Sequence, residues 1–351
     1  MSLVIYGATG FTGRLIVEEA RARGLRPVLA GRRRAELEAL AARWSPALEV
    51  RVAAPGDPAS LAAMLDGAEV LLTTVGPFTD YGLPVAEAAA RAGVHYLDTT
   101  GEQPFMADCR ALFHDVMAAR GKVMINAAAF EYTPGTLAAA LLLAERGPVE
   151  TLDVAYHMVG GGASRGTLKS ILRLAGSPGV GFENGGFAPL GALERTLRLP
   201  LRPGAPPATL AQFPGGEVLA APRLGRVRNV RSWIAVPEAA AMAGPFARLL
   251  MRFARDGLGY AALSALIDRL PAGPAEADRR AAVARVVLLL DGERADLPCP
   301  DPYGLTARIA VDLAERLLRG EQRASGVVSA AEAFEPGELL ACYGLALERR
   351  R

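Results

Sequence analysis

Seven residues near the N-terminus have the spacing of a loop that binds phosphate. The loop Gly7-Ala8-Thr9-Gly10-Phe11-Thr12-Gly13 directly follows the apolar run Leu3–Tyr6 and precedes a segment with helical periodicity. In such a unit the first glycine permits a tight turn, the second lets a pyrophosphate approach the backbone, and the third lets the helix pack closely. The positive end of the helix then attracts the phosphates. The GxxGxxG spacing predicts a dinucleotide site, and a glycine-rich turn without a ligand is the alternative.

A second turn, about twenty residues further on, carries arginines where many dinucleotide sites have a carboxylate. Sites that prefer NAD place Asp or Glu there to bind the ribose 2′-hydroxyl. Here the turn reads Ala30-Gly31-Arg32-Arg33-Arg34, and the first carboxylate is Glu36. A guanidinium binds a 2′-phosphate through charge-assisted hydrogen bonds. Gly31, Arg32 and Arg33 therefore predict NADP as the cofactor, with Arg32 as the first candidate and a solvated basic turn as the alternative.

Two further turns follow later apolar runs of the same region. In sheets of this kind the ligand lies outside the carboxyl ends of the strands, so both turns are expected to face the nicotinamide half. Ordinary strand-end turns without a ligand are the alternative. The candidate contacts are Val75, Gly76, Pro77 and Phe78 after one strand, and Thr100 and Gly101 after the next.

A nicotinamide reaction also needs a group that handles a proton, within about 3 Å of the substrate or one water away. Tyr132 and His157 are the most versatile acids near the expected cleft, and they are our candidate catalytic residues. Each also suits a purely structural position in a core or strand. Ser164 and Thr167 could instead cap a helix that begins near Leu168. The other side chains that could serve are Glu102, Glu131, Ser164, Thr167 and Tyr303.

Composition and charge exclude several classes of protein. The net charge of +2 over 351 residues gives no reason to expect nucleic-acid binding. Cys109, Cys299 and Cys342 are odd in number and far apart, and the three histidines lack metal-ligand spacing, so we expect free thiols and no metal. No apolar run is long enough to span a bilayer and no signal peptide is evident. We therefore expect a soluble cytoplasmic protein with a small-molecule or lipid-like substrate.

Short β-type runs alternate with helical patterns through the first 125 or so residues. Such alternation is typical of βαβ units and predicts an α/β protein with a doubly wound parallel sheet. The predicted strands are 3–6, 27–30, 48–53, 70–75, 95–97 and 123–125, and the predicted helices are 14–23, 35–44, 59–65, 84–92 and 104–120.

Beyond Asn126 the pattern indicates a second, mixed α/β domain. We expect helices at 135–146 and 305–318 and strands at 151–159, 226–236 and 282–290. The predicted domains are a nucleotide-binding domain at 1–128, a substrate and dimerisation domain at 129–300, and a C-terminal segment at 321–351. We expect a helix at about 301–320 to pack back on the first domain.

The segment 239–270 is apolar, with a helical pattern in its middle. Phe246, Leu249, Leu250 and Phe253 repeat at helical spacing, with arginines between them. Internal packing or dimerisation is the first interpretation of this pattern. Contact with lipid or an acyl chain is the alternative.

Several motifs act together as a family signature. They are GATGFTGR at 7–14, AGR at 30–32, VGPF at 75–78 followed by Tyr81-Gly82, and HYLDTTGE at 95–102. Further along stand FEYTP at 130–134, SRGTLKS at 164–170, DPYGLTA at 301–307 and GVVSAAEAF at 326–334. Together they resemble the saccharopine dehydrogenase-like oxidoreductases, a family that includes bacterial trans-acting enoyl reductases. The resemblance spans nearly the whole chain and is strongest over 1–135.

The resemblance implies a Rossmann domain, an inserted α/β domain with substrate and often homodimer contacts, and NAD(P)-dependent oxidoreduction. It leaves the substrate open, because Ala129 and Thr136 depart from the glycine and aspartate usual at these positions of the family. The leading hypothesis is an NADPH-dependent reductase of a small or lipid-like substrate. The alternatives are a non-catalytic NADP(H) sensor or scaffold, and an imine reductase that joins an amine to a keto acid.

Overall fold

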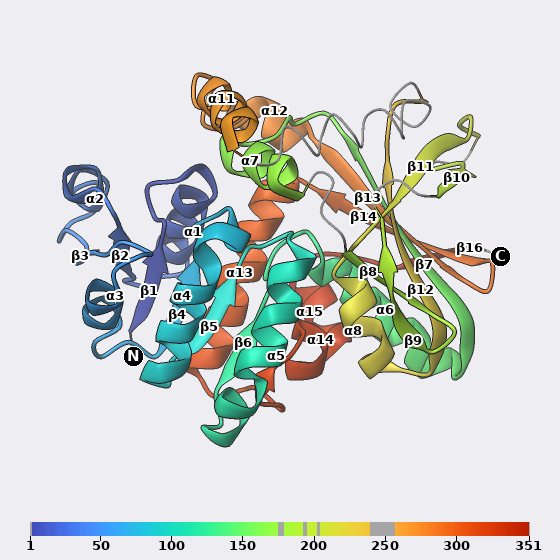
Figure 1. Ribbon diagram of the computed structural model, residues 1–351, viewed down its shortest axis with the longest axis horizontal. Helices are drawn as coiled ribbons and strands as arrows, with labels where there is room; N and C mark the ends of the chain where they lie inside the picture. Colours follow the sequence, from blue (N-terminus) through green and yellow to red (C-terminus); the bar gives the residue numbers. More distant parts are fainter. Residues whose placement is uncertain (1, 175–178, 192–194, 202–203, 239–256, 351) are drawn as a thin grey trace. The chain divides into compact units, whose positions relative to one another are not determined.

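Two compact units make up the chain (Figure 1). The computed structural model describes residues 2–174, 179–191, 195–201, 204–238 and 257–350. Unit 1 contains residues 1–100, 104–133 and 303–334, and unit 2 contains residues 101–103, 134–302 and 335–351. Both units are therefore assembled from segments that are far apart in the sequence.

Unit 1 is built on a parallel sheet, sheet A, with seven strands in the described part of the chain. Their order is β15-β6-β5-β4-β1-β2-β3, and every neighbouring pair is parallel. The chain reverses its direction of growth between β1 and β4, which is the doubly wound topology, so the predicted fold class is confirmed. The strands are β1 (Leu3–Tyr6), β2 (Val28–Gly31), β3 (Val50–Val52), β4 (Val70–Thr73), β5 (His95–Asp98), β6 (Val123–Ile125) and β15 (Gly326–Val327).

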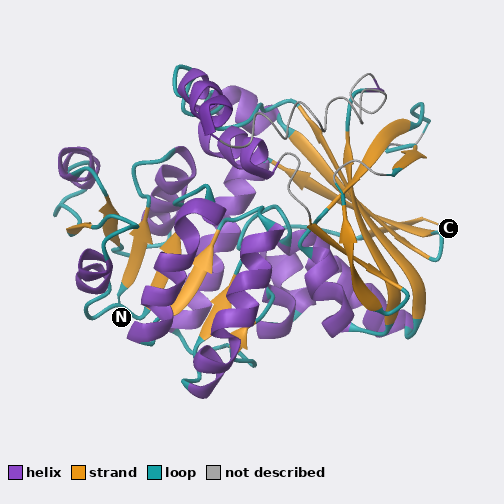
Figure 2. Ribbon diagram, in the orientation of Figure 1, coloured by secondary structure: helices purple, strands orange, loops and turns teal. Residues whose placement is uncertain are grey.

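Helices cover both faces of sheet A (Figure 2). The strands β1, β2, β4 and β5 are buried along their whole length, as expected for a parallel sheet between two helical layers. On one face Val4, Leu71 and Met124 share a core cluster with side chains of α3, α4 and α5. The helices are α1 (Phe11–Ala22), α2 (Arg34–Ala41), α3 (Pro58–Met64), α4 (Phe78–Ala92), α5 (Gln103–Ala119), α13 (Pro302–Leu318) and α14 (Ala330–Ala333).

The predicted strands and helices of this region are found within about three residues of their expected bounds, apart from α4. This helix begins at Phe78 and not at residue 84, because Pro84, a residue typical of a helix start, lies inside it. The strand β15 was not expected, because two residues carry no periodicity. It pairs with β6 through Gly326↔Val123 and Val327↔Met124, and so extends sheet A by a segment from the far end of the chain.

Unit 2 is built on a mixed sheet, sheet B. The main path is β10-β11-β12-β7-β13-β14-β16; off this path β8 pairs with β12, and β9 pairs with β8. Only β12 and β7 pair in parallel on this path. Its strands are β7 (Val149–Val159), β8 (Gly179–Glu183), β9 (Gly186–Leu190), β10 (Thr196–Leu199), β11 (Ala208–Phe213), β12 (Val227–Ala235), β13 (Val283–Leu290), β14 (Glu293–Pro300) and β16 (Glu348–Arg350).

The helices of unit 2 pack around this sheet, and a buried carboxylate joins one of them to it. Glu217, at the start of α8, accepts hydrogen bonds from the hydroxyls of Tyr156 and Ser232 on β7 and β12. A Cβ at Gly135 would lie 2.6 Å from the Tyr156 hydroxyl, so a larger residue would displace this contact. The helices are α6 (Thr133–Arg146), α7 (Arg165–Leu174), α8 (Glu217–Leu224), α11 (Gly257–Ile267), α12 (Glu276–Ala281) and α15 (Pro336–Cys342).

The mixed character of unit 2 agrees with the predicted second domain, but several of its strands were missed. β14 contains Pro298 and Pro300, and β9 contains Pro189. Proline lowers the strand signal because it cannot donate to a ladder hydrogen bond. The helical repeat predicted around Phe246 and Phe253 lies outside the described residues.

Candidate functional site

The turns that carry the predicted cofactor contacts meet at one edge of sheet A. Tyr6 at the end of β1 is in register with Ala30 of β2 and with Thr73 of β4. Thr73 is in turn in register with Asp98, the last residue of β5. The loops after β1, β2, β4 and β5 therefore leave the sheet side by side, at the carboxyl edge where ligands of this fold bind.

The glycine loop between β1 and α1 has the conformation that its glycines permit. Gly7 has φ of +88°, a region that side chains rarely adopt, and its N–H donates to the Ala30 carbonyl at 2.9 Å. A Cβ at Gly13 would lie 2.1 Å from the Gly7 carbonyl oxygen. The roles assigned to Gly7 in turning and to Gly13 in close packing are thus met by the geometry.

No side chain caps the first turn of α1. Its N-cap, Gly10, has no side chain, so no side-chain cap occupies the N–H groups there. By contrast, Asp57 at the start of α3 accepts a hydrogen bond from the Ala59 N–H. Exposed N–H groups at a helix N-terminus bind phosphate well, and this turn fits the pyrophosphate of a dinucleotide.

In the turn after β2, the two arginines that were candidates for binding the 2′-phosphate have different surroundings. Arg33 Nε lies 2.7 Å from Glu36 Oε1, so its charge is already paired. Arg32 is exposed, and within the described part of the chain it makes neither an ion pair nor a side-chain hydrogen bond. Burial raises the pKa of Tyr6 to about 12, and the nearby positive charge of Arg32 opposes part of that rise. Arg32 therefore offers an uncompensated charge close to the end of β1.

The turn after β4 is joined to the glycine loop. The Thr74 hydroxyl donates to the Gly7 carbonyl at 3.2 Å, and a Cβ on Gly7 would lie 2.6 Å from the same hydroxyl oxygen. Val75, Gly76 and Pro77 follow, and Phe78 begins α4 with its ring 5.5 Å from that of Phe105. Of the predicted contacts in this turn, Val75 lies next to Gly7, since its Cγ2 would be 3.0 Å from a Cβ there.

Asp98 connects the loops that follow β5 and β6. The carboxylate is fully buried and accepts hydrogen bonds from the Thr100 N–H at 3.0 Å, the Ala127 N–H at 2.8 Å and the Asn126 amide at 2.7 Å. Burial raises the pKa of Asp98 to about 6, while these hydrogen bonds oppose the rise. Asp98 was not among the predicted site residues. The sequence feature that could have identified Asp98 is a carboxylate at the end of a buried strand.

Of the two predicted contacts after β5, Thr100 belongs to unit 1 and Gly101 to unit 2. Thr100 is buried, and its N–H is held by Asp98. Gln103 also belongs to unit 2, where its side chain donates to the carbonyls of Val180 and Gly215 at 2.9 Å.

The loop after β6 is bound to the start of α13. The Phe130 N–H donates to the Thr306 hydroxyl at 3.0 Å, and the Tyr303 ring meets that of Phe11 edge-on at 5.0 Å. Tyr132, a predicted catalytic residue, is buried in this loop. Desolvation raises the pKa of Glu131 beside it. The first turn of α13 therefore joins the glycine loop to the segment that carries Tyr132.

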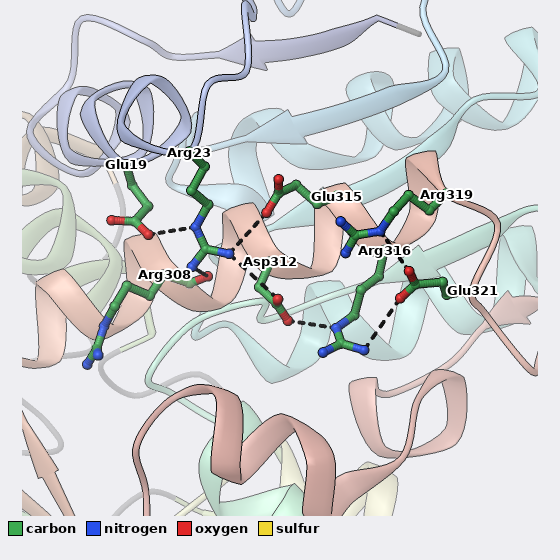
Figure 3. Close-up of polar contacts among 8 residues, drawn as sticks. All are labelled: Glu19, Arg23, Arg308, Asp312, Glu315, Arg316, Arg319 and Glu321. Carbon is green, nitrogen blue, oxygen red and sulfur yellow. Dashed lines mark hydrogen bonds and ion pairs between the residues drawn. The ribbon is translucent and has the colours of Figure 1, made fainter.

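The helices α13 and α1 are also joined near the other end of α1 by a network of ion pairs (Figure 3). Arg23 contacts Glu19 at 2.7 Å, Glu315 at 3.0 Å and Asp312 at 3.6 Å. Asp312 is buried and also binds Arg316 at 2.9 Å. Both ends of the phosphate-facing helix are thus held by α13.

The remaining candidates lie in unit 2. His157, the second predicted catalytic residue, is half-buried on β7 in register with Arg285, so it and Tyr132 belong to different units. The Ser164 hydroxyl accepts a hydrogen bond from the Thr167 N–H at 3.2 Å, which is the helix cap considered for this pair. Glu102 is buried and accepts a hydrogen bond from the Ser170 hydroxyl at 2.7 Å.

Neither a metal-binding cluster nor a membrane-crossing helix is found among the described residues. No group of three or more His, Cys, Asp or Glu side chains there could hold a metal ion. Among the helices that the structure describes, none is both long and apolar enough to cross a membrane.

Comparison with known proteins assigns the class of the first domain. Residues 3–128 match the family of the saccharopine dehydrogenase NADP binding domain. The glycine loop, the uncapped helix and the arginine turn fit that cofactor, and the prediction of NADP is confirmed. Residues 3–128 thus form an NADP-binding domain of the saccharopine dehydrogenase type, as the motifs of this region indicated.

Among the relatives, two mycobacterial proteins are similar to parts of the chain. A candidate trans-acting enoyl reductase of Mycobacterium tuberculosis is 37% identical over 182 residues, which are 49% of this chain and 43% of that protein. The trans-acting enoyl reductase of Mycobacterium leprae is 41% identical over 143 residues, 38% of this chain and 34% of that protein. The chain spans less than half the length of these relatives.

Two solved structures share the fold over nearly the whole chain. The saccharopine dehydrogenase (L-Glu forming) of Saccharomyces cerevisiae has a TM-score of 0.65 at 12% identity and covers 99% of both chains. Homospermidine synthase of Legionella pneumophila, in complex with NAD, has a TM-score of 0.64 at 8% identity and covers 99% of this chain and 91% of its own. At such identities the likeness concerns the fold alone.

Proposed function

We propose that this chain is an NADPH-dependent reductase of an activated carbon–carbon double bond in a small or lipid-like substrate. The observation that supports the cofactor assignment is the exposed Arg32, which forms no ion pair with the described residues and lies at the edge of the sheet where the glycine loop leaves β1. The similarity to trans-acting enoyl reductases supports the choice of double bond.

Each part of the cofactor has a candidate group in unit 1. The first-turn N–H groups of α1 would hold the pyrophosphate, and Arg32 would hold the 2′-phosphate. Residues Val75 to Phe78 and Thr100 follow strands on the nicotinamide side of the sheet, with Gly101 next in the chain. Bound NADPH supplies a hydride to the substrate, and the protein must orient the substrate and manage the accompanying proton.

The loop after β6 supplies the candidate proton groups in unit 1. It leaves the carboxyl edge of sheet A on the nicotinamide side, and its Phe130 is held by Thr306. We keep Tyr132 as the candidate acid and add Glu131, whose raised pKa makes it a better proton carrier near neutral pH than an ordinary carboxylate. His157 remains the candidate in unit 2.

Substrate class is tested by following NADPH oxidation with three sets of compounds: enoyl thioesters, carbonyl compounds, and amine–keto acid pairs. Turnover confined to the enoyl thioesters is expected. Turnover confined to the amine–keto acid pairs would indicate an imine reductase instead. Tight NADPH binding with no turnover of any set would favour a nucleotide sensor or scaffold.

Cofactor preference is tested by replacing Arg32. Arg32→Ala should weaken NADPH binding by about 10- to 100-fold, because a charge-assisted contact to phosphate is lost, and should leave NADH binding nearly unchanged. Titration of the intrinsic fluorescence of each reduced nucleotide measures both affinities. Arg33→Ala is the matched control, since Arg33 already pairs with Glu36, and its effect should be several-fold smaller. Equal losses for NADPH and NADH would contradict a 2′-phosphate site.

A further inference from the structure

The helices α7 and α11 of unit 2 pair through their polar sides. Lys169 Nζ lies 2.8 Å from Asp268 Oδ1, and the Arg165 guanidinium donates to the Asp268 carbonyl at 3.0 Å. The Arg173 guanidinium lies 3.8 Å from the centre of the Tyr260 ring. The three cations of α7 are four residues apart and share one face of that helix. Tyr260 and Asp268, eight residues apart, mark the side of α11 that meets it.

Among the residues that the structure describes, this pairing leaves an apolar stripe of α11 exposed on its outer side. Leu263 and Leu266 lie on the helix, and Leu270 lies in the turn that continues it, where its N–H donates to the Ile267 carbonyl at 3.0 Å. Residues three and seven apart share a helix face, and these leucines are 38%, 57% and 45% exposed. We call Leu263, Leu266 and Leu270 the leucine stripe. A helix with its polar side packed inward and its leucines outward is the reverse of the usual surface helix.

The helix pair that carries the leucine stripe has a net positive charge. Arg165, Lys169, Arg173 and Arg269 stand against the single acid Asp268 in α7, α11 and the turn after α11. Arg269 is exposed, follows the stripe residue Leu266 by three positions, and makes no ion pair with the described part of the chain. A second copy of this surface would bring like charges together, which disfavours self-association. An apolar stripe with Arg269 close by in the sequence, on a helix pair of net positive charge, is complementary to an anionic lipid surface.

We propose that the helix pair α7–α11 docks on the surface of a lipid bilayer that carries anionic lipids. The leucine stripe would enter the boundary between headgroups and acyl chains, and Arg269 would contact the lipid phosphates. Such a helix lies on the membrane and does not span it, in keeping with the lengths of the described helices. This docking is independent of the reaction proposed above, since it uses none of the cofactor residues.

Vesicle sedimentation tests the proposal with the full chain. We expect binding to phosphatidylcholine vesicles that contain phosphatidylglycerol, weaker binding to pure phosphatidylcholine, and a decrease at high salt. The double variant Leu263→Ser with Leu266→Ser should lose binding by about tenfold or more, because two side chains no longer bury apolar surface. Arg269→Gln should lower binding only to the anionic vesicles.

Leu112→Ser is the matched control, because Leu112 is 61% exposed and lies on α5, a helix that packs on sheet A and is not part of the α7–α11 pair. It should bind vesicles like the unaltered protein. Circular dichroism and NADPH affinity check that each variant is folded. The proposal is overturned if the unaltered protein does not bind anionic vesicles, or if the double variant binds as well as the control. It is also overturned if light scattering shows an oligomer that dissociates in the double variant, since the stripe would then be covered by a second copy.

Discussion

At the scale of single residues, the two ends of β5 respond to acid in opposite directions. His95, its first residue, is buried, and its Nδ1 accepts a hydrogen bond from the Val123 N–H at 3.0 Å, so the ring is neutral. Burial, helped by the charge of Lys122, lowers the pKa of His95 to about 4. Asp98, the last residue, has its pKa raised to about 6 by burial. His95 therefore contributes stability that is complete above its ordinary pKa of 6.5 and is lost as the pH falls toward 4. The contribution of Asp98 is instead lost as the pH rises toward 6.

Replacing His95 should isolate its part of this acid response. His95→Asn keeps an acceptor for the Val123 N–H but cannot be protonated in this range. Between pH 6.5 and pH 4 the unaltered protein should lose about 2–3 kcal/mol of unfolding free energy relative to the variant. Urea unfolding of both proteins at several pH values measures this difference. Because Asp98 is present in both proteins, its opposing effect cancels. His157→Asn controls for the loss of a histidine in general. A difference that does not change with pH would show that His95 is not the group responsible.

At the scale of elements, α13 positions the phosphate-facing helix α1 through contacts near both of its ends. Tyr303 packs on Phe11 at the start of α1, and Arg23 just beyond its end binds Asp312 and Glu315. Arg23→Ala should lower the unfolding free energy by about 1–3 kcal/mol, because buried Asp312 would lose its contact with the Arg23 guanidinium. Arg91→Ala is the control, since its pair with Glu87 is exposed, and it should cost less than about 0.5 kcal/mol. Denaturant titration compares the two variants, and equal effects would contradict a special role for Arg23.

At the scale of the whole molecule, unit 1 depends on a segment from the far end of the chain. The helix α13 supplies Leu305, Ile309 and Leu313 to its buried interior, and β15 completes the edge of sheet A. A fragment of residues 1–133 contains the entire predicted nucleotide-binding domain but lacks these parts. We expect it to unfold without cooperativity and to bind NADPH poorly, because buried apolar side chains would face water. Thermal unfolding followed by circular dichroism tests this expectation. A sharp transition together with full NADPH affinity would show that the first 133 residues suffice.

The sequence by itself determined the features of this protein that depend on neighbouring residues. The alternating strands and helices of sheet A, the Gly7–Gly13 loop and the Arg32 turn could all be predicted. Each is set by periodicity or by backbone freedom within a few residues. The strands of sheet B that contain proline, such as β14, could not be predicted, because their pairing with distant strands outweighs a weak local preference.

Only the tertiary structure decided which distant residues meet. It separated Arg32 from Arg33 by pairing Arg33 with Glu36, and it placed Tyr132 and His157 in different units. It also brought Tyr303 to Phe11 and Thr306 to Phe130, across most of the length of the chain. Such contacts leave no periodic trace in the sequence, because the burial and hydrogen bonding that select them exist only once the whole fold has formed.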